Sequence, residues 1–224
     1  REPIEMTVIP RDSQVATTIP PTKDQPKRQL TNQEVVDATL DKAMRITPDI
    51  ESLEPLRGIP LDEIYITNAE DDSPTGIIPA TQWPSFKPLA KTPPKEILIT
   101  EIDDYRDSEG KIVSQNITPP DLSPLYGKSI ISKIVFGTKN LQEWEGILQN
   151  FTIQKASIYI TSYQNPQTTL KPLAGAKITK SLSVRVAARE GTIDFTGIDS
   201  LAVTPPELNM SLFIADQKLL NPEA

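Results

Sequence analysis

Apolar and polar residues alternate with a period of two along most of the chain beyond Lys95. This period is typical of strands that bury one face, because successive side chains of a strand point to opposite sides of a sheet. The clearest case is residues 178–189, where Ile178, Leu182 and Val184 share one face. We expect eight strands, at residues 96–102, 111–117, 129–136, 151–163, 178–189, 192–196, 200–204 and 208–215.

The expected strands and the turn residues between them predict a fold class. The first two strands flank Asp107-Ser108-Glu109-Gly110, a glycine-closed loop that favours a hairpin. Short strands with turn signals at this spacing favour two packed antiparallel sheets. We therefore expect residues 95–224 to form an antiparallel β-sandwich, either jelly-roll-like or Ig-like.

Two capping patterns predict short helices. Thr31 and Glu34 match a capping box, in which each side chain bonds the other residue's backbone N–H. Val36, Leu40 and Met44 then recur at helical spacing before Thr47-Pro48 stops the run, which predicts a helix over 31–45 with an apolar stripe that needs a partner. A second pattern at Asn140 predicts one short helix with Trp144 on its buried side.

The front of the chain is rich in proline, since residues 1–94 hold fourteen of the 22 prolines. Such a segment favours extended or polyproline II backbone and buries little of itself. We expect an extended arm over residues 1–94 that contains the helix and one short strand at 63–67. Its isolated apolar residues, with those of the helix, are the predicted partner-binding set: Ile4, Val8, Ile9, Val15, Ile19, Val36, Leu40 and Met44.

Charge and hydropathy argue against nucleic acid as a partner and against insertion into a membrane. The formal net charge of −7 argues against nucleic acid, because binding to phosphates depends on clustered Lys and Arg. No apolar run approaches the roughly 18 residues that a membrane-spanning helix requires. The chain begins with Arg1 and not with Met, so we expect an upstream segment in the gene product.

The composition also argues against an enzyme. The chain has no His and no Cys, so the usual general bases, nucleophiles and soft metal ligands are missing. The acidic group Asp103, Asp104, Asp107 and Glu109 lacks calcium-loop spacing, and its place in a hairpin tip offers no pocket. Gly127-Lys128-Ser129 enters a strand where a phosphate loop needs a helix. We expect no catalytic, cofactor-binding or metal site.

Thr-Pro-Pro occurs three times, at 92–94, 118–120 and 204–206. The residues around these tripeptides share no longer pattern, so we interpret them as strand ends or sheet corners, since proline cannot donate into a strand ladder. A ligand for a proline-recognition domain is the alternative, and the absence of basic residues around a P-x-x-P core disfavours it.

These features together predict a structural subunit of a large assembly, with a virus or bacteriophage particle as its location. Stiff arms that run over neighbours add buried surface at a low entropic cost. The expected partners are copies of the chain and other structural proteins of the same particle, in a capsid, decoration, tail or baseplate role. The alternative is a periplasmic or cell-surface sandwich that binds carbohydrate or protein near Trp83, Trp144, Tyr105 and Tyr163.

Overall fold

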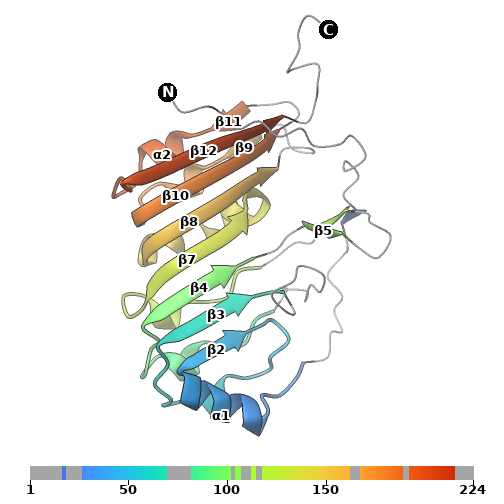
Figure 1. The fold of residues 1–224 in the computed structure, drawn as a ribbon, viewed down its shortest axis with the longest axis vertical. Helices are drawn as coiled ribbons and strands as arrows, with labels where there is room; N and C mark the ends of the chain where they lie inside the picture. Colours follow the sequence, from blue (N-terminus) through green and yellow to red (C-terminus); the bar gives the residue numbers. More distant parts are fainter. Residues whose placement is uncertain are drawn as a thin grey trace, which may run out of the picture.

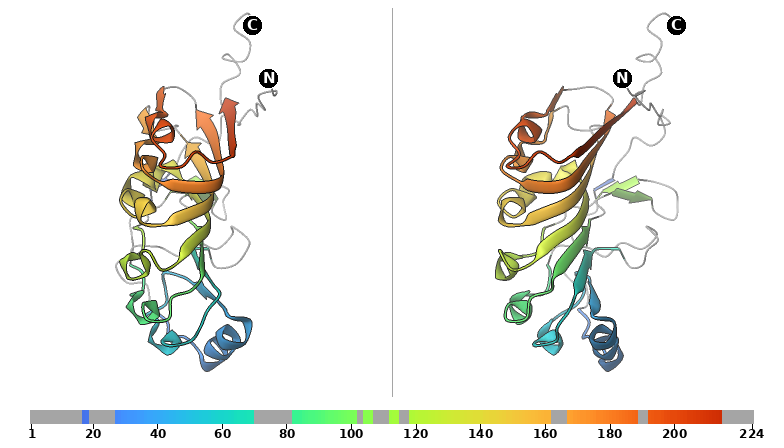
Figure 2. Two further views of the ribbon diagram at one scale, coloured as in Figure 1. Left: turned by 90° about the vertical axis from the view of Figure 1, so that its left-hand side faces the viewer. Right: turned by 60° about the vertical axis from the view of Figure 1, so that its left-hand side comes forward.

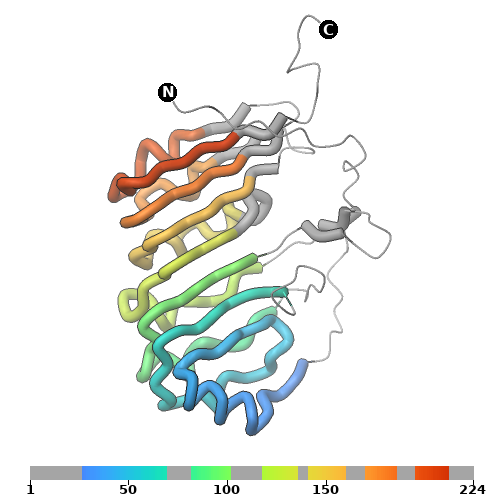
Figure 3. Tube along the Cα trace, in the orientation of Figure 1, coloured from blue at the N-terminus to red at the C-terminus, as the bar shows by residue number. Residues whose placement is uncertain are grey.

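One parallel sheet of seven strands dominates the computed structural model of the chain (Figure 1). The structure describes residues 17–18, 27–69, 82–101, 104–106, 112–114, 118–161, 167–188 and 192–214. The sheet is made of β2 (Ala43–Ile46), β3 (Glu63–Thr67), β4 (Glu96–Thr100), β7 (Ile130–Gly137), β8 (Thr152–Thr161), β10 (Lys177–Ala188) and β12 (Glu207–Ile214). Its strands are stacked in the order in which they occur in the chain, so the colours in Figure 3 run from blue to red along the stack.

A short helical turn precedes most of the strands and lies under the sheet. The turns are η2 (Glu54–Leu56), η3 (Lys87–Leu89), η4 (Ser123–Leu125), η5 (Thr138–Trp144), η6 (Leu148–Asn150), η7 (Lys171–Leu173) and the four-residue helix α2 (Thr196–Asp199). Figure 2 shows these turns together on one side of the sheet. Strand, connection and turn therefore make one coil of a solenoid, the plan also found in leucine-rich repeats.

The turns share a sequence motif that gives them one backbone conformation. Apolar-x-Pro-Leu-x-Gly occurs at residues 53–58, 122–127 and 170–175, and 86–89 keeps its first four positions. The leading residues Leu53, Phe86, Leu122 and Leu170 have φ between −96° and −88° and ψ between 0° and 8°. In each turn the leading residue and the following leucine are buried. The motif therefore fixes two apolar anchors per coil beneath the sheet.

Our prediction of an antiparallel β-sandwich is wrong, because every pairing within the main sheet is parallel. The alternating pattern was correct evidence for strands that bury one face. Parallel sheets usually carry helices on both faces and then consist of almost continuous apolar runs, so alternation favours an antiparallel interpretation. A solenoid is an exception, since its turns cover only one face of a parallel sheet.

Individual elements were predicted with mixed success. The strand at 63–67 is confirmed, as are strands within 96–102, 129–136, 151–163, 178–189 and 208–215. The predicted hairpin joined residues 96–102 with 111–117, and its first strand is wrong, because β4 pairs with β3 and β7 in the main sheet. The antiparallel pair is instead β5 (Asp104–Arg106) with β6 (Ile112–Ser114). Residues 200–204 form no strand, only an isolated bridge at Val203.

The remaining strands are short and lie outside the main sheet. β1 (Thr17–Thr18) pairs with β6, and β9 (Gln167–Thr169) pairs with β11 (Thr192–Asp194) in parallel. The strand expected at 192–196 is therefore confirmed in part. The helix predicted from Asn140 is a 3-10 helix, and its buried side carries Trp144 as expected.

The helix predicted near Thr31 is confirmed as α1 (Asn32–Asp41), which covers the β2 end of the stack (Figure 1). The capping box is formed, with the Glu34 N–H donating to Thr31 Oγ1 at 3.1 Å and the Thr31 N–H donating to Glu34 Oε1 at 3.2 Å. Ala38 is buried beneath the helix. The helix ends at Asp41 rather than at residue 45, because Lys42 takes a left-handed conformation and β2 begins directly after it.

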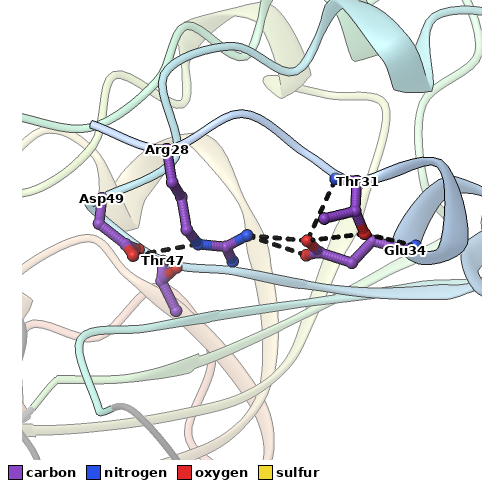
Figure 4. Close-up of polar contacts among 5 residues, drawn as sticks. All are labelled: Arg28, Thr31, Glu34, Thr47 and Asp49. Atoms are coloured by element: carbon purple, nitrogen blue, oxygen red, sulfur yellow. Dashed lines mark hydrogen bonds and ion pairs between the residues drawn. The ribbon is translucent and has the colours of Figure 1, made fainter. Parts of the chain in front are cut away.

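A small polar network attaches α1 to the first coil (Figure 4). Arg28 lies at its centre, with its Nε 3.0 Å from Asp49 Oδ2 and an Nη1 2.9 Å from Glu34 Oε1. Partial burial would raise the pKa of Glu34, but the hydrogen bond from Thr31 and the bond and charge of Arg28 outweigh it and lower this pKa. A lowered pKa means that Glu34 stabilises the fold above its ordinary pKa and loses this contribution as the pH falls through its folded value.

Thr31→Ala removes the cap of α1, and we expect it to lower the free energy of unfolding by about 0.5–2 kcal/mol. Amide hydrogen exchange should accelerate in residues 32–41 more than in the sheet. Thr39→Ala is the matched control, because Thr39 is an exposed residue within the same helix. Equal protection of α1 in the Thr31 variant and the parent would contradict the capping role.

Gly127→Ala tests the backbone of the turn motif. Gly127 has φ of +69°, and an added Cβ would meet no atom within 4 Å, so strain in the left-handed conformation is the only direct penalty. We expect Ala to lower the free energy of unfolding by about 1 kcal/mol and Asn to lower it less. Urea denaturation of both variants measures the difference; equal losses would show that the left-handed conformation is not the cause.

Candidate functional site

The sheet face opposite the turns is the candidate functional site, and we call it the open face. It is made of the outward residues of β4, β7, β8 and β10. The cross-strand pairings align them in rows, namely Leu98, Lys133, Lys155 and Ser181; Thr100, Val135, Ser157 and Ser183; and Tyr159 with Arg185. Each of these side chains is half-buried or exposed, whereas their core-facing neighbours are buried. The alternation of each strand thus presents these side chains to solvent on a rigid support.

Two exposed lysines stand beside each other in the middle of the open face. Lys133 on β7 and Lys155 on β8 are direct cross-strand partners. Neighbouring strands are about 4.8 Å apart, and like charges placed opposite each other destabilise a sheet. Within the described residues neither lysine has an ion pair. A fold that keeps two like charges together on a rigid surface is suited to binding an anion.

An arginine and a tyrosine lie further along the same face. Arg185 on β10 is the cross-strand partner of Tyr159 on β8, and its guanidinium carbon is 5.9 Å from the centre of the tyrosine ring. Tyr159 remains 43% exposed. A guanidinium over an aromatic face gains a cation–π attraction, which helps to orient its donors. Ser157 and Ser183 separate this pair from the lysines, so the surface between them is low and polar.

Three neighbouring strands of the sheet contain basic residues and no acidic ones. β7, β8 and β10 together hold Lys133, Lys155, Lys177, Lys180 and Arg185. The chain as a whole has 30 acidic and 23 basic residues, so this separation of charge runs against its composition. These three strands therefore carry a positive formal charge in a protein whose net charge is negative. The run of acid-free strands was visible in the sequence, and we missed it because we treated charge only as a total.

A second arginine–tyrosine pair lies at the other end of the sheet but is less accessible. The Arg45 guanidinium carbon is 5.2 Å from the centre of the Tyr65 ring. An Nη2 of Arg45 donates to the carbonyl of Ala69 at 2.8 Å, so the segment after β3 lies against it. Both side chains are half-buried. Because Arg45 and Tyr65 are half-buried and in contact with their own chain, we assign them a role in stabilising the sheet and not in binding.

The predicted partner-binding residues fall into three groups. Val36 and Leu40 lie on α1 and are 49% and 75% exposed, so they do present an apolar surface. Met44 does not share that surface, because it lies on β2 and is buried in the core. Its position four residues after Leu40 suggested a longer helix, which the left-handed Lys42 interrupts. The remaining residues lie outside the described part of the chain: Ile4, Val8, Ile9, Val15 and Ile19.

Other residues singled out from the sequence contribute no site that the structure describes. Of the acidic group, Asp103, Asp107 and Glu109 lie outside the described residues, and Asp104 belongs to β5. Groups of three or more potential metal ligands are absent from the described residues. Gly127-Lys128-Ser129 forms a turn that enters β7, as the sequence predicted. This turn is part of the coil that leads into β7.

The two tryptophans proposed for ligand contact are not on the open face. Trp144 is buried, and its indole N–H donates to Glu101 Oε2 at 2.6 Å. Trp83 donates to the carbonyl of Thr118 at 2.7 Å and packs against the core. Tyr163 and the side chain of Tyr105 are outside the described part of the chain. The two tryptophans therefore hold the coils together.

Lys133→Glu tests whether the lysine pair is strained. It replaces a like-charge pair with an ion pair to Lys155, and we expect the free energy of unfolding to rise by a few tenths of a kcal/mol, up to about 1. The gain should shrink in about 0.5 M NaCl, where exposed charges are screened. Lys91→Glu, at an exposed site on the turn side, is the control. A loss of stability on Lys133→Glu would show that the pair is not unfavourable.

Comparisons with other proteins do not narrow the function. No protein-family model, no curated protein and no solved structure matches the chain. Among the described residues, no helix has the length and apolar character needed to span a bilayer. The functional argument therefore depends on the geometry and charge of the open face.

Proposed function

We propose that the protein is a binding module whose open face receives an acidic, extended segment of a partner protein. The observation that carries this proposal is the pair Lys133 and Lys155, which are adjacent, exposed and without an acidic neighbour on their strands. Solenoids of this plan use their extended sheet surface for binding. This proposal keeps the protein-binding alternative predicted from the sequence and replaces its sandwich with a solenoid.

The spacing of the basic groups indicates the form of the ligand. Lys155 and Tyr159 lie four residues apart on β8, about 13 Å along the strand at about 3.3 Å per residue. Arg185 is paired with Tyr159, so the second basic site lies at that distance from the lysine pair. An extended peptide that runs along the strands places acidic side chains at positions i and i+4 on one side with the same separation. The low surface at Ser157 leaves room for the backbone between them.

Charge makes an acidic partner a better fit than an apolar one. The outward residues of β7, β8 and β10 are mainly Lys, Ser, Tyr and Arg, which bind by charge, hydrogen bonds and ring contacts. Exposed ion pairs contribute little individually, so the expected binding is moderate and sensitive to salt. Nucleic acid remains a poor match, because a site of this size supplies few phosphate contacts within a chain of net charge −7.

The assembly role predicted from the sequence remains a second proposal. Its support is the outward pair Val36 and Leu40, which leaves an apolar stripe on α1 without a covering element in the described structure. Such a stripe fits a groove on another protein. A virus or bacteriophage particle belongs to this proposal. The arm expected over residues 1–94 is corrected by the structure, because its described residues from 27 to 94 form α1 and the first coils of the solenoid. The open face distinguishes the two roles, because an arm-mediated subunit does not require it.

A fluorescent peptide with Glu at positions i and i+4 tests the acidic-ligand proposal. Fluorescence anisotropy should show binding that weakens as NaCl rises, and the same peptide with Gln should not bind. Lys133→Gln with Lys155→Gln should weaken binding about twofold to thirtyfold, since each lost exposed ion pair removes about 0.2–1 kcal/mol.

Lys87→Gln with Lys91→Gln is the matched control, because both lysines are exposed on the turn side and the net charge changes equally. This variant should bind the acidic peptide as the parent does. Equal weakening by both double variants would mean that net charge alone attracts the peptide and would reject the open face as the site. Failure of the parent to bind any acidic peptide in low salt would also reject the proposal.

A further inference from the structure

The last coil exposes apolar side chains that every preceding coil buries. Leu208 and Met210 on β12 are aligned with Leu182 and Val184 on β10, which are fully buried. Leu208 is nevertheless 43% exposed and Met210 is 48% exposed. Phe195 and Val203, from the same coil, are also exposed. The pattern of the core thus continues to the end of the described stack, where no described element covers it.

The opposite end of the solenoid is treated differently. There α1 covers β2, buries Ala38 and Leu30, and is attached through the Arg28 network. A stack of coils needs a cap at each end, because the terminal coil has no neighbour to cover its apolar layer. The end at β12 therefore exposes apolar side chains, as an interface does, where a cap would cover them.

The edge of β12 also lacks the features that normally prevent pairing. Among the described strands, β12 is bonded only to β10, so no described strand pairs with the backbone donors and acceptors of its other edge. Edge strands are commonly protected by lysine, proline or a bulge. Glu207–Ile214 contains no lysine and no proline, and its register with β10 has no bulge. Its one charged residue is Glu207, at the start of the strand.

We propose that β12 is a self-association surface, where two copies of the chain join antiparallel through this edge. A two-fold axis perpendicular to the sheet keeps the open faces on one side and the turn layers on the other. Leu208 and Met210 of each copy then face the apolar layer of the other. The two Glu207 side chains lie at opposite ends of the joint ladder, so no like charges oppose each other. The product is one continuous sheet through both copies.

The available area fits a weak, reversible dimer. Eight residues at about 3.3 Å each make an edge about 26 Å long, and two packed layers at about 10 Å each are roughly 20 Å deep. The contact therefore buries roughly 500 Å² per copy, or about 1,000 Å² in total, near the lower limit for a specific interface. A second copy satisfies both the backbone groups and the apolar side chains of the edge, since it presents the same pattern in return.

Sedimentation velocity of the full chain over a concentration series tests the proposal. We expect a monomer–dimer equilibrium. Met210→Lys should raise the dimer dissociation constant by about tenfold or more, because the two-fold axis places the new charge in the contact twice. Leu208→Lys is the second variant, so that the result does not depend on one substitution. Circular dichroism and the melting temperature of each variant show that the coil remains folded.

Val36→Lys is the matched control, because Val36 is 49% exposed and lies on α1 at the capped end. This variant should dimerise as the parent does. A parent that stays monomeric at every concentration would overturn the proposal, as would a dimer that persists in both β12 variants. Loss of the dimer in Val36→Lys alone would assign self-association to α1 and would also overturn it.

Discussion

The structure depends on the burial of two apolar anchors per coil beneath one sheet. In each turn of the motif, the first residue and the leucine three positions later, such as Leu53 and Leu56, are withdrawn from water. The proline between them restricts the backbone, and the glycine that follows in three of the turns adopts positive φ. Each connection returns the chain beneath the sheet through such a turn before the next strand begins, so consecutive strands run in the same direction. Parallel pairing therefore follows from the path of the connections.

This constraint also creates the site. The turns can cover only one face of the sheet, so the outward residues of β7, β8 and β10 are left for solvent or a partner. The open face can then carry side chains that do not serve folding, including adjacent lysines that a purely structural sheet has no reason to keep. The rigid spacing of the strands fixes these charges in place, which reduces the entropy lost on binding.

The two ends of the stack differ in whether a described element covers the apolar core. At β2 a helix with a capping box and an arginine network closes the core. At β12 the apolar layer continues to the edge, and the strand has no lysine or proline to discourage pairing. The backbone pairing and apolar burial that stack one coil on the next can therefore also form a contact with a second molecule. A self-paired edge and an acidic ligand on the open face are compatible, since they use different surfaces.

Local features were well determined by the sequence. The capping box at Thr31 and Glu34 forms as expected, and the strand at 63–67 has the predicted bounds, because both depend on neighbouring residues alone. The direction of the strands and the layer that covers them were not determined locally. The helical turns begin at residues 54, 87, 123, 138, 148, 171 and 196, at intervals that range from 10 to 36 residues, so no fixed period revealed the coils. Only tertiary packing brings Lys133 beside Lys155, because their 22-residue separation becomes one strand spacing when consecutive coils stack.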